Sequence, residues 1–387
     1  MANYIPINKN NLIWARESAG FSQEELLKKF PKYIDWEKGS ANPTYSQLEQ
    51  LAFKFHRPLA IFFFPDLPEE QSIEKSLRAI RNEDVETLTP SVRFLFRKAK
   101  AFQIYLKELY KEELHEQAQK IKWLSLQSNH KPILELANYA REYLGITIND
   151  QILWSDSDEA LNKWREILAK KGVYIFKEAF KNDKISGFCV YDPYFPLIFI
   201  NNSLSKNRQI FTIFHELGHL FFEESYLDVF DDTFWRLEYE KPDHIEVKCN
   251  AFAGHFLVPD SEINKNTIGD VDIDNKIECL ASYYKVSKEV ILRKFLNAKY
   301  INNDYYFNKI NEWYGKSKKE EKKSSGGSYY NTKLAYLGDT YLATVFNKYY
   351  QGKISIEKAS EYLDIKMRSF NGIEDAFLRK GGNNVYI

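Results

Sequence analysis

The stretch of sequence that decides the fold is His215-Glu216-Leu217-Gly218-His219. Mostly apolar residues stand on both sides of it, at 210–214 and 220–222, which predicts a buried helix. On a helix, positions i and i+4 lie one above the other, so the imidazoles of His215 and His219 can reach one metal ion. Without such compensation, two histidines and a glutamate would be costly to bury. The motif therefore predicts a metal site.

Zinc is the ion that this pattern favours, because zinc binds imidazole nitrogen and takes four ligands in a tetrahedral arrangement. A catalytic zinc keeps one position for water, so one more protein ligand is needed. Zinc polarises the scissile carbonyl and lowers the pKa of the water, and Glu216 accepts the proton and passes it to the leaving amine. We predict Zn2+ as the cofactor, His215 and His219 as ligands, and Glu216 as the catalytic base.

The third ligand is expected on a second helix, over residues 245–258, which a proline then ends. Glu246 is the one carboxylate within this mostly apolar stretch. His255 lies about half a turn away around the helix axis, and His244 precedes the helix body. We favour Glu246 as the third ligand, with the two histidines as less favoured alternatives.

Four separated elements resemble the ImmA/IrrE family of metallopeptidases. They are, in order, 198–201 (Ile-Phe-Ile-Asn), 208–219 with the motif, Glu246 with 250–253, and 257–259 (Leu-Val-Pro). The resemblance covers roughly residues 170 to 300. It implies a thermolysin-like zincin core of the gluzincin kind, in which the two histidines and the later glutamate bind zinc and the motif glutamate is the base. It also implies highly selective cleavage of a partner protein, often a repressor.

Strands are expected before the motif, at 173–176, 185–190 and 197–200, where aromatic and β-branched residues are enriched. We predict an α+β fold, with a zincin-like core of a small sheet and the HExxH helix, flanked by all-helical N-terminal and C-terminal domains. An edge strand beside a zincin site can pair with an extended peptide through backbone hydrogen bonds. The last strand is our candidate for substrate binding, through Ile198, Phe199, Ile200 and Asn201.

The first 68 residues contain strings, at 15–26 and 36–39, that resemble a Cro/repressor-type (XRE) helix-turn-helix domain. Ser22 with Glu25 three residues later predicts a helix start with a capping box. Only the five residues 31–35 are left for a recognition helix, about one helical turn, which is too short for one of normal length. We predict a degenerate domain that docks protein and binds DNA weakly or not at all; no set of DNA-contacting residues is identifiable.

The domain organisation that we predict has five segments. They are a repressor-like domain at 1–68, a helical connecting region at 69–149, the zinc metallopeptidase domain at 150–300, a charged and then Gly/Ser-rich linker at 301–328, and a C-terminal helical module at 329–387. We take the C-terminal module to serve docking or oligomerisation.

Composition excludes several classes of partner. The 54 basic residues balance the 54 acidic ones, so no global field attracts nucleic acid or an anionic membrane. Three scattered cysteines are too few for a disulfide framework and fit a reducing cytoplasm. The N-terminus has no apolar signal core, and no apolar run reaches the length of a bilayer span. We therefore expect a cytoplasmic protein without a membrane partner.

We expect the function to be that of a zinc endopeptidase of narrow specificity. Its substrate would be an intracellular partner protein, such as a transcriptional repressor in a stress, mobile-element or defence system. One alternative is an antitoxin or regulatory binding protein that grips a cognate toxin or partner, with the zinc fold partly a scaffold. A second alternative is a DNA-binding transcriptional regulator. The oligomeric state and the oxyanion-stabilising residue are left open by the sequence.

Overall fold

The chain divides into two compact units, Met1–Ala101 and Phe102–Ile387, each with its own hydrophobic core. The computed structural model describes residues 4–68, 89–125, 131–182, 185–222, 226–229, 244–266, 272–317 and 328–381. Among the described residues, every helix is too short or too polar to cross a bilayer. The division of the chain into five functional segments stays a prediction.

The first unit is helical. Its elements are α1 (Lys9–Ala19), α2 (Gln23–Leu27), α3 (Tyr33–Lys38), α4 (Tyr45–Phe55) and the 3-10 helix η1 (Leu59–Phe63). Local sequence sets several of their ends. Ser22 and Glu25 form the predicted capping box at α2, and Thr44 forms a second capping box at α4. Gly39 ends α3 in the left-handed conformation, with φ of 79°, which favours glycine.

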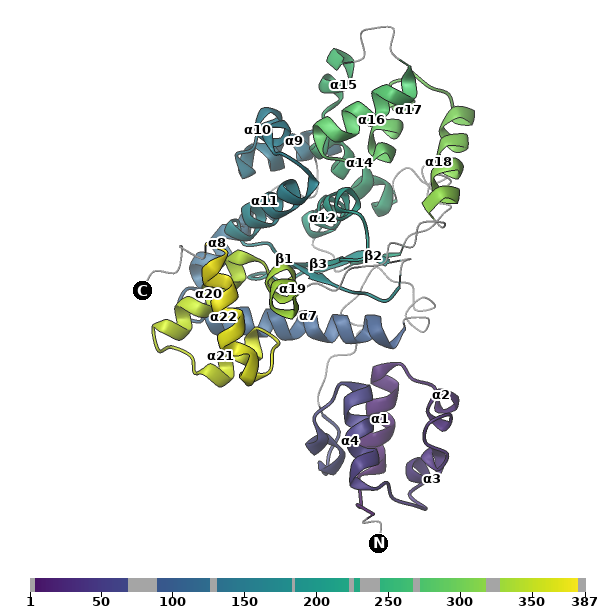
Figure 1. The fold of residues 1–387 in the computed structure, drawn as a ribbon, viewed down its shortest axis with the longest axis vertical. Helices are drawn as coiled ribbons and strands as arrows, with labels where there is room; N and C mark the ends of the chain where they lie inside the picture. Colours follow the sequence, from purple (N-terminus) through teal and green to yellow (C-terminus); the bar gives the residue numbers. More distant parts are fainter. Residues whose placement is uncertain are drawn as a thin grey trace. The chain divides into compact units, whose positions relative to one another are not determined.

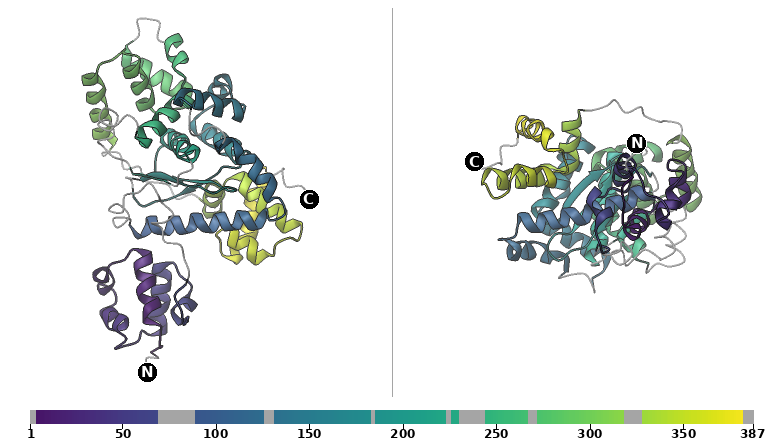
Figure 2. Two further views of the ribbon diagram at one scale, coloured as in Figure 1. Left: turned by 180° about the vertical axis from the view of Figure 1, so that it is seen from behind. Right: turned by 90° about the horizontal axis from the view of Figure 1, so that it is seen from below.

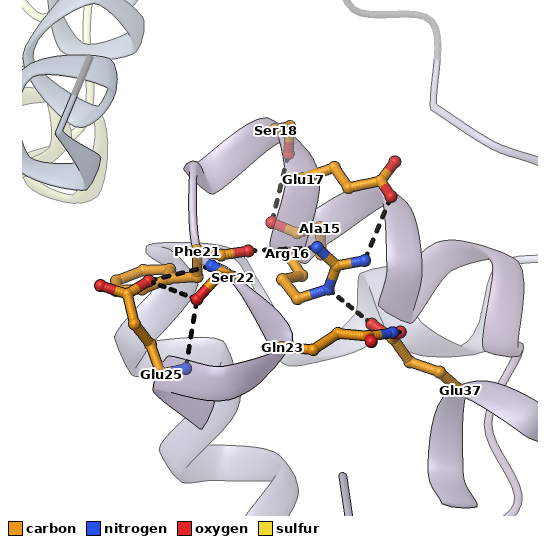
Figure 3. A network of polar contacts seen from close by, with 9 residues as sticks. All are labelled: Ala15, Arg16, Glu17, Ser18, Phe21, Ser22, Gln23, Glu25 and Glu37. Atoms are coloured by element: carbon orange, nitrogen blue, oxygen red, sulfur yellow. Dashed lines mark hydrogen bonds and ion pairs between the residues drawn. The ribbon is translucent and has the colours of Figure 1, made fainter. Parts of the chain in front are cut away.

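A polar network ties the first three helices of this unit together (Figure 3). Arg16 on α1 donates from Nε to Glu37 Oε1 on α3 at 2.7 Å. Gln23 on α2 donates to the other carboxylate oxygen of Glu37 at 2.5 Å. Glu37 is buried, so these charge-assisted bonds satisfy a group that would otherwise be costly to bury.

The third helix, α3, is short, as the sequence analysis predicted for the recognition helix, but it begins and ends later than expected. The interval 31–35 was the space considered for this helix, whereas the helix begins at Tyr33 and ends at Lys38, a length of 6 residues. Tyr33, Trp36 and Glu37 are buried, so half of the helix is used in packing. Asp35 and Lys38 are its exposed charged residues, one of each sign.

A four-stranded mixed sheet organises the second unit, with the strand order β1-β3-β2-β4. Its strands are β1 (Tyr174–Glu178), β2 (Ile185–Val190), β3 (Leu197–Asn201) and β4 (Tyr226–Val229). β1 and β3 are parallel, and the other two pairs are antiparallel. The first three strands and the α+β class were predicted from the sequence, and the structure confirms them. β4 was not predicted.

The prediction of an edge strand is wrong for Ile198, Phe199, Ile200 and Asn201. β3 lies between β1 and β2, so that Ile198 pairs with Ile175 on one side and with Cys189 on the other. Its backbone groups are therefore used on both sides and cannot pair with a peptide. All five residues of β3 are buried. The strands at the two edges of the sheet are β1 and β4.

Helices cover both faces of the sheet, as Figures 1 and 2 show. α11 (Ser157–Lys170) and α12 (Lys206–Phe221) lie on one face. On the other face lies the part of α7 (Pro90–Leu109) that belongs to the second unit, from Phe102 on, where Phe102 packs against Phe176 with ring centroids 4.5 Å apart. Because helices bury both faces of the sheet, the sequences of the strands are almost continuously apolar.

The remaining helices complete the second unit around these layers (Figure 1). They are α8 (Leu114–Ser125), α9 (Ile133–Leu144), α10 (Ile148–Leu153), α14 (Ile245–Leu257), α15 (Asp260–Asn266), α16 (Ile273–Tyr284), α17 (Lys288–Asn297), α18 (Asn303–Ser317), α19 (Tyr329–Leu337), α20 (Asp339–Tyr350), α21 (Ile356–Tyr362), η2 (Met367–Ser369) and α22 (Phe370–Arg379).

The first half of the predicted linker at 301–328 is helical, because α18 occupies Asn303–Ser317. Tyr306 is buried in the main core, and Phe307 and Ile310 pack against it. Apolar contacts at helical spacing therefore outweigh the charged composition that suggested a linker. Residues 318–327, with the Gly/Ser-rich stretch, lie outside the described residues.

Candidate metal centre

The helix that carries the HExxH motif is buried along most of its length, as predicted. Ser205 caps α12 by accepting a hydrogen bond from the backbone N–H of Arg208 at 3.3 Å. His215 is 2% exposed, while Glu216 and His219 are fully buried. Two imidazoles and a carboxylate are thus held inside the protein, where a charged group needs compensation.

The second helix, α14, approaches α12 at a glycine of the motif. A Cβ atom placed on Gly218 would lie 3.1 Å from Cys249 Sγ and 3.2 Å from Cys249 Cα. The absence of a side chain at Gly218 therefore allows the two backbones to come close. At the start of α14, His244 Nδ1 accepts a hydrogen bond from the backbone N–H of Glu246 at 3.3 Å.

Donor atoms of three side chains from these two helices converge on one point. His215 Nε2 and His219 Nε2 are 3.2 Å apart. Glu246 completes the group, with Oε2 3.2 Å from His215 Nε2 and Oε1 3.2 Å from His219 Nε2. A tetrahedral zinc with ligand bonds of about 2.0–2.1 Å would hold its ligand atoms about 3.3 Å apart. The spacing and chemistry of the donors therefore fit zinc.

The three residues are those that the sequence singled out, and the structure brings them together. Among the described residues, they are the one group of at least three His, Cys, Asp or Glu side chains with donor atoms close enough to hold a metal ion. The alternative ligands lie elsewhere. His244 caps α14, and His255 Nδ1 lies 3.1 Å from Lys294 Nζ and 3.3 Å from Asp260 Oδ2.

The electrostatics of Glu246 favour its charged form. Burial raises the pKa of the carboxyl, but hydrogen bonds and charge interactions with His215 and His219 outweigh burial and hold that pKa well below its usual range. A carboxylate that stays ionised at neutral pH is the form that binds a metal ion.

Asn250 orients the first histidine. Its Oδ1 lies 3.0 Å from His215 Nδ1, and because a carbonyl oxygen can only accept, the imidazole carries its proton on Nδ1. With a proton held on Nδ1, Nε2 is the nitrogen that would lose its proton and offer its lone pair when zinc binds, which is the usual arrangement behind a metal-ligating histidine. Asn250 stands four residues after Glu246, on the same face of the helix, but the sequence analysis did not predict this hydrogen bond.

Glu216 lies against β2 at a glycine that sequence reasoning missed. A Cβ atom placed on Gly187 would be 3.7 Å from Glu216 Cγ, 2.9 Å from the Phe199 carbonyl oxygen and only 2.5 Å from Thr212 Cγ2. Gly187 thus lets the strand approach α12 beside the candidate base. A glycine inside a predicted strand was the available signal, since such glycines mark close backbone approaches.

A pair of i, i+4 histidines, a carboxylate from a following helix and a buried glutamate beside the first histidine define a metallopeptidase type of centre. The family model described as Peptidase_M78, the IrrE N-terminal-like domain, matches residues 168–296. All three donor residues and Glu216 lie within that range. Residues 168–296 are therefore a metallopeptidase domain of this family, as the resemblance over roughly 170 to 300 implied.

The family match does not extend to the rest of the chain. A comparison with curated proteins gave no match. The match at 168–296 does not reach the first 68 residues, so the helix-turn-helix resemblance stays a prediction.

Replacing Gly218 should open the metal centre. In Gly218→Val the added carbons would meet Cys249 and push α14 away from α12, so we expect zinc affinity to fall by ~10-fold or more. Gly218→Ala should have a smaller effect in the same direction. The measurement is zinc affinity by competition with a chelator.

Gly254→Ala is the matched control, because a Cβ there would meet nothing closer than 3.8 Å. It should bind zinc as the wild type does. Wild-type zinc affinity in Gly218→Val would show that the close contact of the helices does not support the site.

The two glutamates should differ in their effect on zinc content. Glu246→Gln keeps the shape of the side chain but removes the charge that balances zinc, so we expect a large loss of bound zinc. Glu216→Gln should retain zinc, because Glu216 is not one of the converging donors. Elemental analysis after dialysis decides: equal zinc in wild type and Glu246→Gln would exclude Glu246 as the third ligand.

Proposed function

We propose that this protein is a zinc-dependent endopeptidase of narrow specificity. The observation that carries the proposal is the set of three 3.2 Å distances that join the Nε2 atoms of His215 and His219 to each other and each to one carboxylate oxygen of Glu246. Buried Glu216 stands next to His215 in the motif. His215, His219 and Glu246 would hold the zinc ion. When bound, zinc would supply a Lewis acid that polarises a scissile carbonyl and lowers the pKa of a water molecule.

In this proposal, Glu216 handles the proton. Its carboxylate accepts the proton from the attacking water and returns it to the leaving amine. Glu216 directly follows the donor His215 in the chain and is fully buried, so its carboxylate is held beside the site and away from bulk water. Gly187 contributes by bringing β2 against Glu216 without a side chain in between.

The strand that we propose for substrate binding is β4 rather than β3. β4 pairs with β2, the strand that contacts α12 at Gly187, and among the described residues it has no second strand partner. The other edge of the sheet is less suitable, because α19 packs against β1. An extended peptide could add to β4 through backbone hydrogen bonds, whatever its sequence.

Selectivity would then come from docking outside the sheet. We propose that the substrate is a specific intracellular protein, such as a transcriptional repressor of a stress, mobile-element or defence system, and that the first unit helps to dock it. Phe53 on α4 is 82% exposed, and Phe63, Phe64 and Leu67 of the same unit are also exposed. Exposed apolar side chains of this size favour a protein partner.

We propose further that the first unit is a degenerate helix-turn-helix domain with little affinity for DNA. A recognition helix presents several side chains to base edges. α3 has 6 residues, of which Tyr33, Trp36 and Glu37 are buried, and exposed Asp35 would repel phosphate. Too few outward side chains are left to read a base sequence.

Glu216→Gln should fold and bind zinc but fail to cleave a substrate, because the site would lack its proton acceptor. We expect the rate to fall by ~10²-fold or more. The rate is measured on a verified substrate, with zinc content as the control for an intact site. Cleavage at the wild-type rate would mean that the base is another residue.

DNA binding by the full chain should be weak, salt-sensitive and independent of sequence. Lys28, Lys29 and Lys32 can contact phosphates, but phosphate contacts carry no sequence information. The measurement titrates the protein against its own promoter and a scrambled duplex at physiological salt. A preference of ~10³-fold or more for the promoter, the scale of specific binding, would contradict the proposal.

The test of the whole proposal is incubation of the zinc-loaded protein with the products of the adjacent genes. We expect one of them to be cleaved at one position by the wild type and left intact by Glu216→Gln. A stable complex in which the partner stays intact with both proteins would contradict peptidase activity and favour the antitoxin or regulatory alternative.

A further inference from the structure

A second set of buried charges lies outside the metal centre, around Lys177 on β1. Lys177 is 3% exposed, and Arg165 on the neighbouring α11 is 6% exposed. Lysine and arginine are rarely buried to this extent unless they are paired with an opposite charge. The question is therefore which groups of opposite charge lie beside Lys177 and Arg165.

Among the described residues, the hydrogen-bond partners of Arg165 are all backbone carbonyl groups. Its guanidinium donates to the carbonyl oxygen of Ile175 at 2.9 Å and, across to the last turn of α19, to those of Ala335 at 2.7 Å and Tyr336 at 2.9 Å. These bonds satisfy its donors but do not neutralise its charge. Within the described part of the chain, no carboxylate forms an ion pair with Arg165 or Lys177, and no hydrogen bond reaches Lys177 Nζ.

Lys177 and Arg165 line a cavity of about 710 Å³. The cavity is bounded by α11 and β1 on one side and by α19 and α20 on the other. Leu334 and Leu337 contribute apolar surface to its lining. Its volume falls within the range of about 300–1,000 Å³ that is usual for small-molecule sites.

The carboxylates of the cavity are already used by other groups. Asp158 pairs with Lys206 at 3.1 Å, and Asp339 pairs with Lys380 at 3.0 Å. Glu166 pairs with Lys170 at 2.7 Å, and Glu159 accepts the backbone N–H of Ser155 at 2.7 Å. Among the described residues that line the cavity, no carboxylate is therefore left to pair with the Lys177 ammonium group.

Electrostatics agree with the geometry. Burial, together with the positive charges of Arg165, Lys206 and Lys380, lowers the pKa of Lys177 to about 7, against the opposing effect of Asp158. Burial also lowers the pKa of Arg165 to about 10. A negative charge in the cavity would reverse these effects and stabilise both charged forms.

We propose that this cavity binds a small organic anion, whose carboxylate or phosphate oxygens contact Lys177 and whose apolar part lies against Leu334 and Leu337. The site is separate from the metal centre, since no metal-centre donor lines it. It joins the metallopeptidase domain, through β1, to the C-terminal helices, whose role the sequence left open. Lys206, which also lines it, is the first residue of α12.

The test uses two probes, inorganic phosphate and succinate, on the full chain at constant ionic strength with chloride as the reference anion. Lysine side chains labelled with 13C at Cε report on Lys177 by NMR. We expect one probe to shift the Lys177 signal saturably, and the preferred probe tells phosphate from carboxylate chemistry. If neither probe gives a saturable shift of that signal, the proposal is overturned.

Lys177→Met provides a second readout, because methionine keeps the length of the side chain without its charge. We expect this variant to lose at least ~10-fold in affinity for the preferred probe, the effect of removing a charge-assisted hydrogen bond. Lys171→Met is the matched control, since Lys171 directly follows the last residue of α11, lies outside the cavity lining and is not the ion-pair partner of a lining carboxylate, and it should bind as the wild type does. Equal affinity in Lys177→Met and wild type would overturn the proposal.

Lys177→Met should also raise the melting temperature in the absence of probe, and more at pH 6 than at pH 9. The pKa of Lys177 lies below that of an unfolded lysine, so the folded chain carries a costly buried charge below about pH 7 and loses it as the pH rises. A melting temperature that falls at pH 6 would mean that the Lys177 charge is already compensated within the chain, which contradicts the proposal.

Discussion

The close contact between α12 and α14 is the constraint on which the metal centre depends. Two of the three ligand side chains come from one helix and the third from the other, so the 3.2 Å distances between histidine nitrogens and glutamate oxygens exist only while the helices stay together. Gly218 makes this possible, because a side chain there would meet Cys249. Asn250 and His244 add local order, the first by fixing the tautomer of His215 and the second by capping the helix that carries Glu246. The motif thus provides the histidine ligands and the candidate base, and the packing of the two helices sets the distances between the donor atoms.

The same rule of charge compensation explains both sites of the second unit. The metal centre contains buried carboxylates next to imidazole nitrogens, and such a group is compensated by a cation. The cavity around Lys177 contains buried cations without a carboxylate partner in the described part of the chain, and such a group is compensated by an anion. The sign of the buried charge at each site thus indicates the kind of ligand that would compensate it, a cation at the metal centre and an anion in the cavity. The helix α12 also links the two sites. Its first residue, Lys206, lines the cavity together with Lys177 of β1, and the donor histidines lie further along the same helix.

Features that depend on local chemistry could be predicted from the sequence, and features that depend on long-range pairing could not. The i, i+4 spacing of the histidines, the isolated carboxylate at Glu246 and the capping box at Ser22 each have a local cause, and the structure contains all three. The central position of β3 has no local signature, because a buried strand reads the same at any place in a sheet. The helix α18 was not predicted, because the charged residues of this segment suggested a linker and its apolar positions were given no weight. The cavity could not be foreseen, since it joins residues of α11 and β1 to side chains more than 150 positions away.

The central claim is that His215, His219 and Glu246 together bind one zinc ion, and X-ray absorption at the zinc edge of the zinc-loaded full chain tests it most directly. The account predicts four-coordinate zinc with nitrogen and oxygen ligands at about 2.0–2.1 Å and the scattering pattern of two imidazole rings. A sulfur ligand at about 2.3 Å would contradict it, because none of the three proposed ligand side chains contains sulfur. Scattering from a single imidazole would contradict it as well.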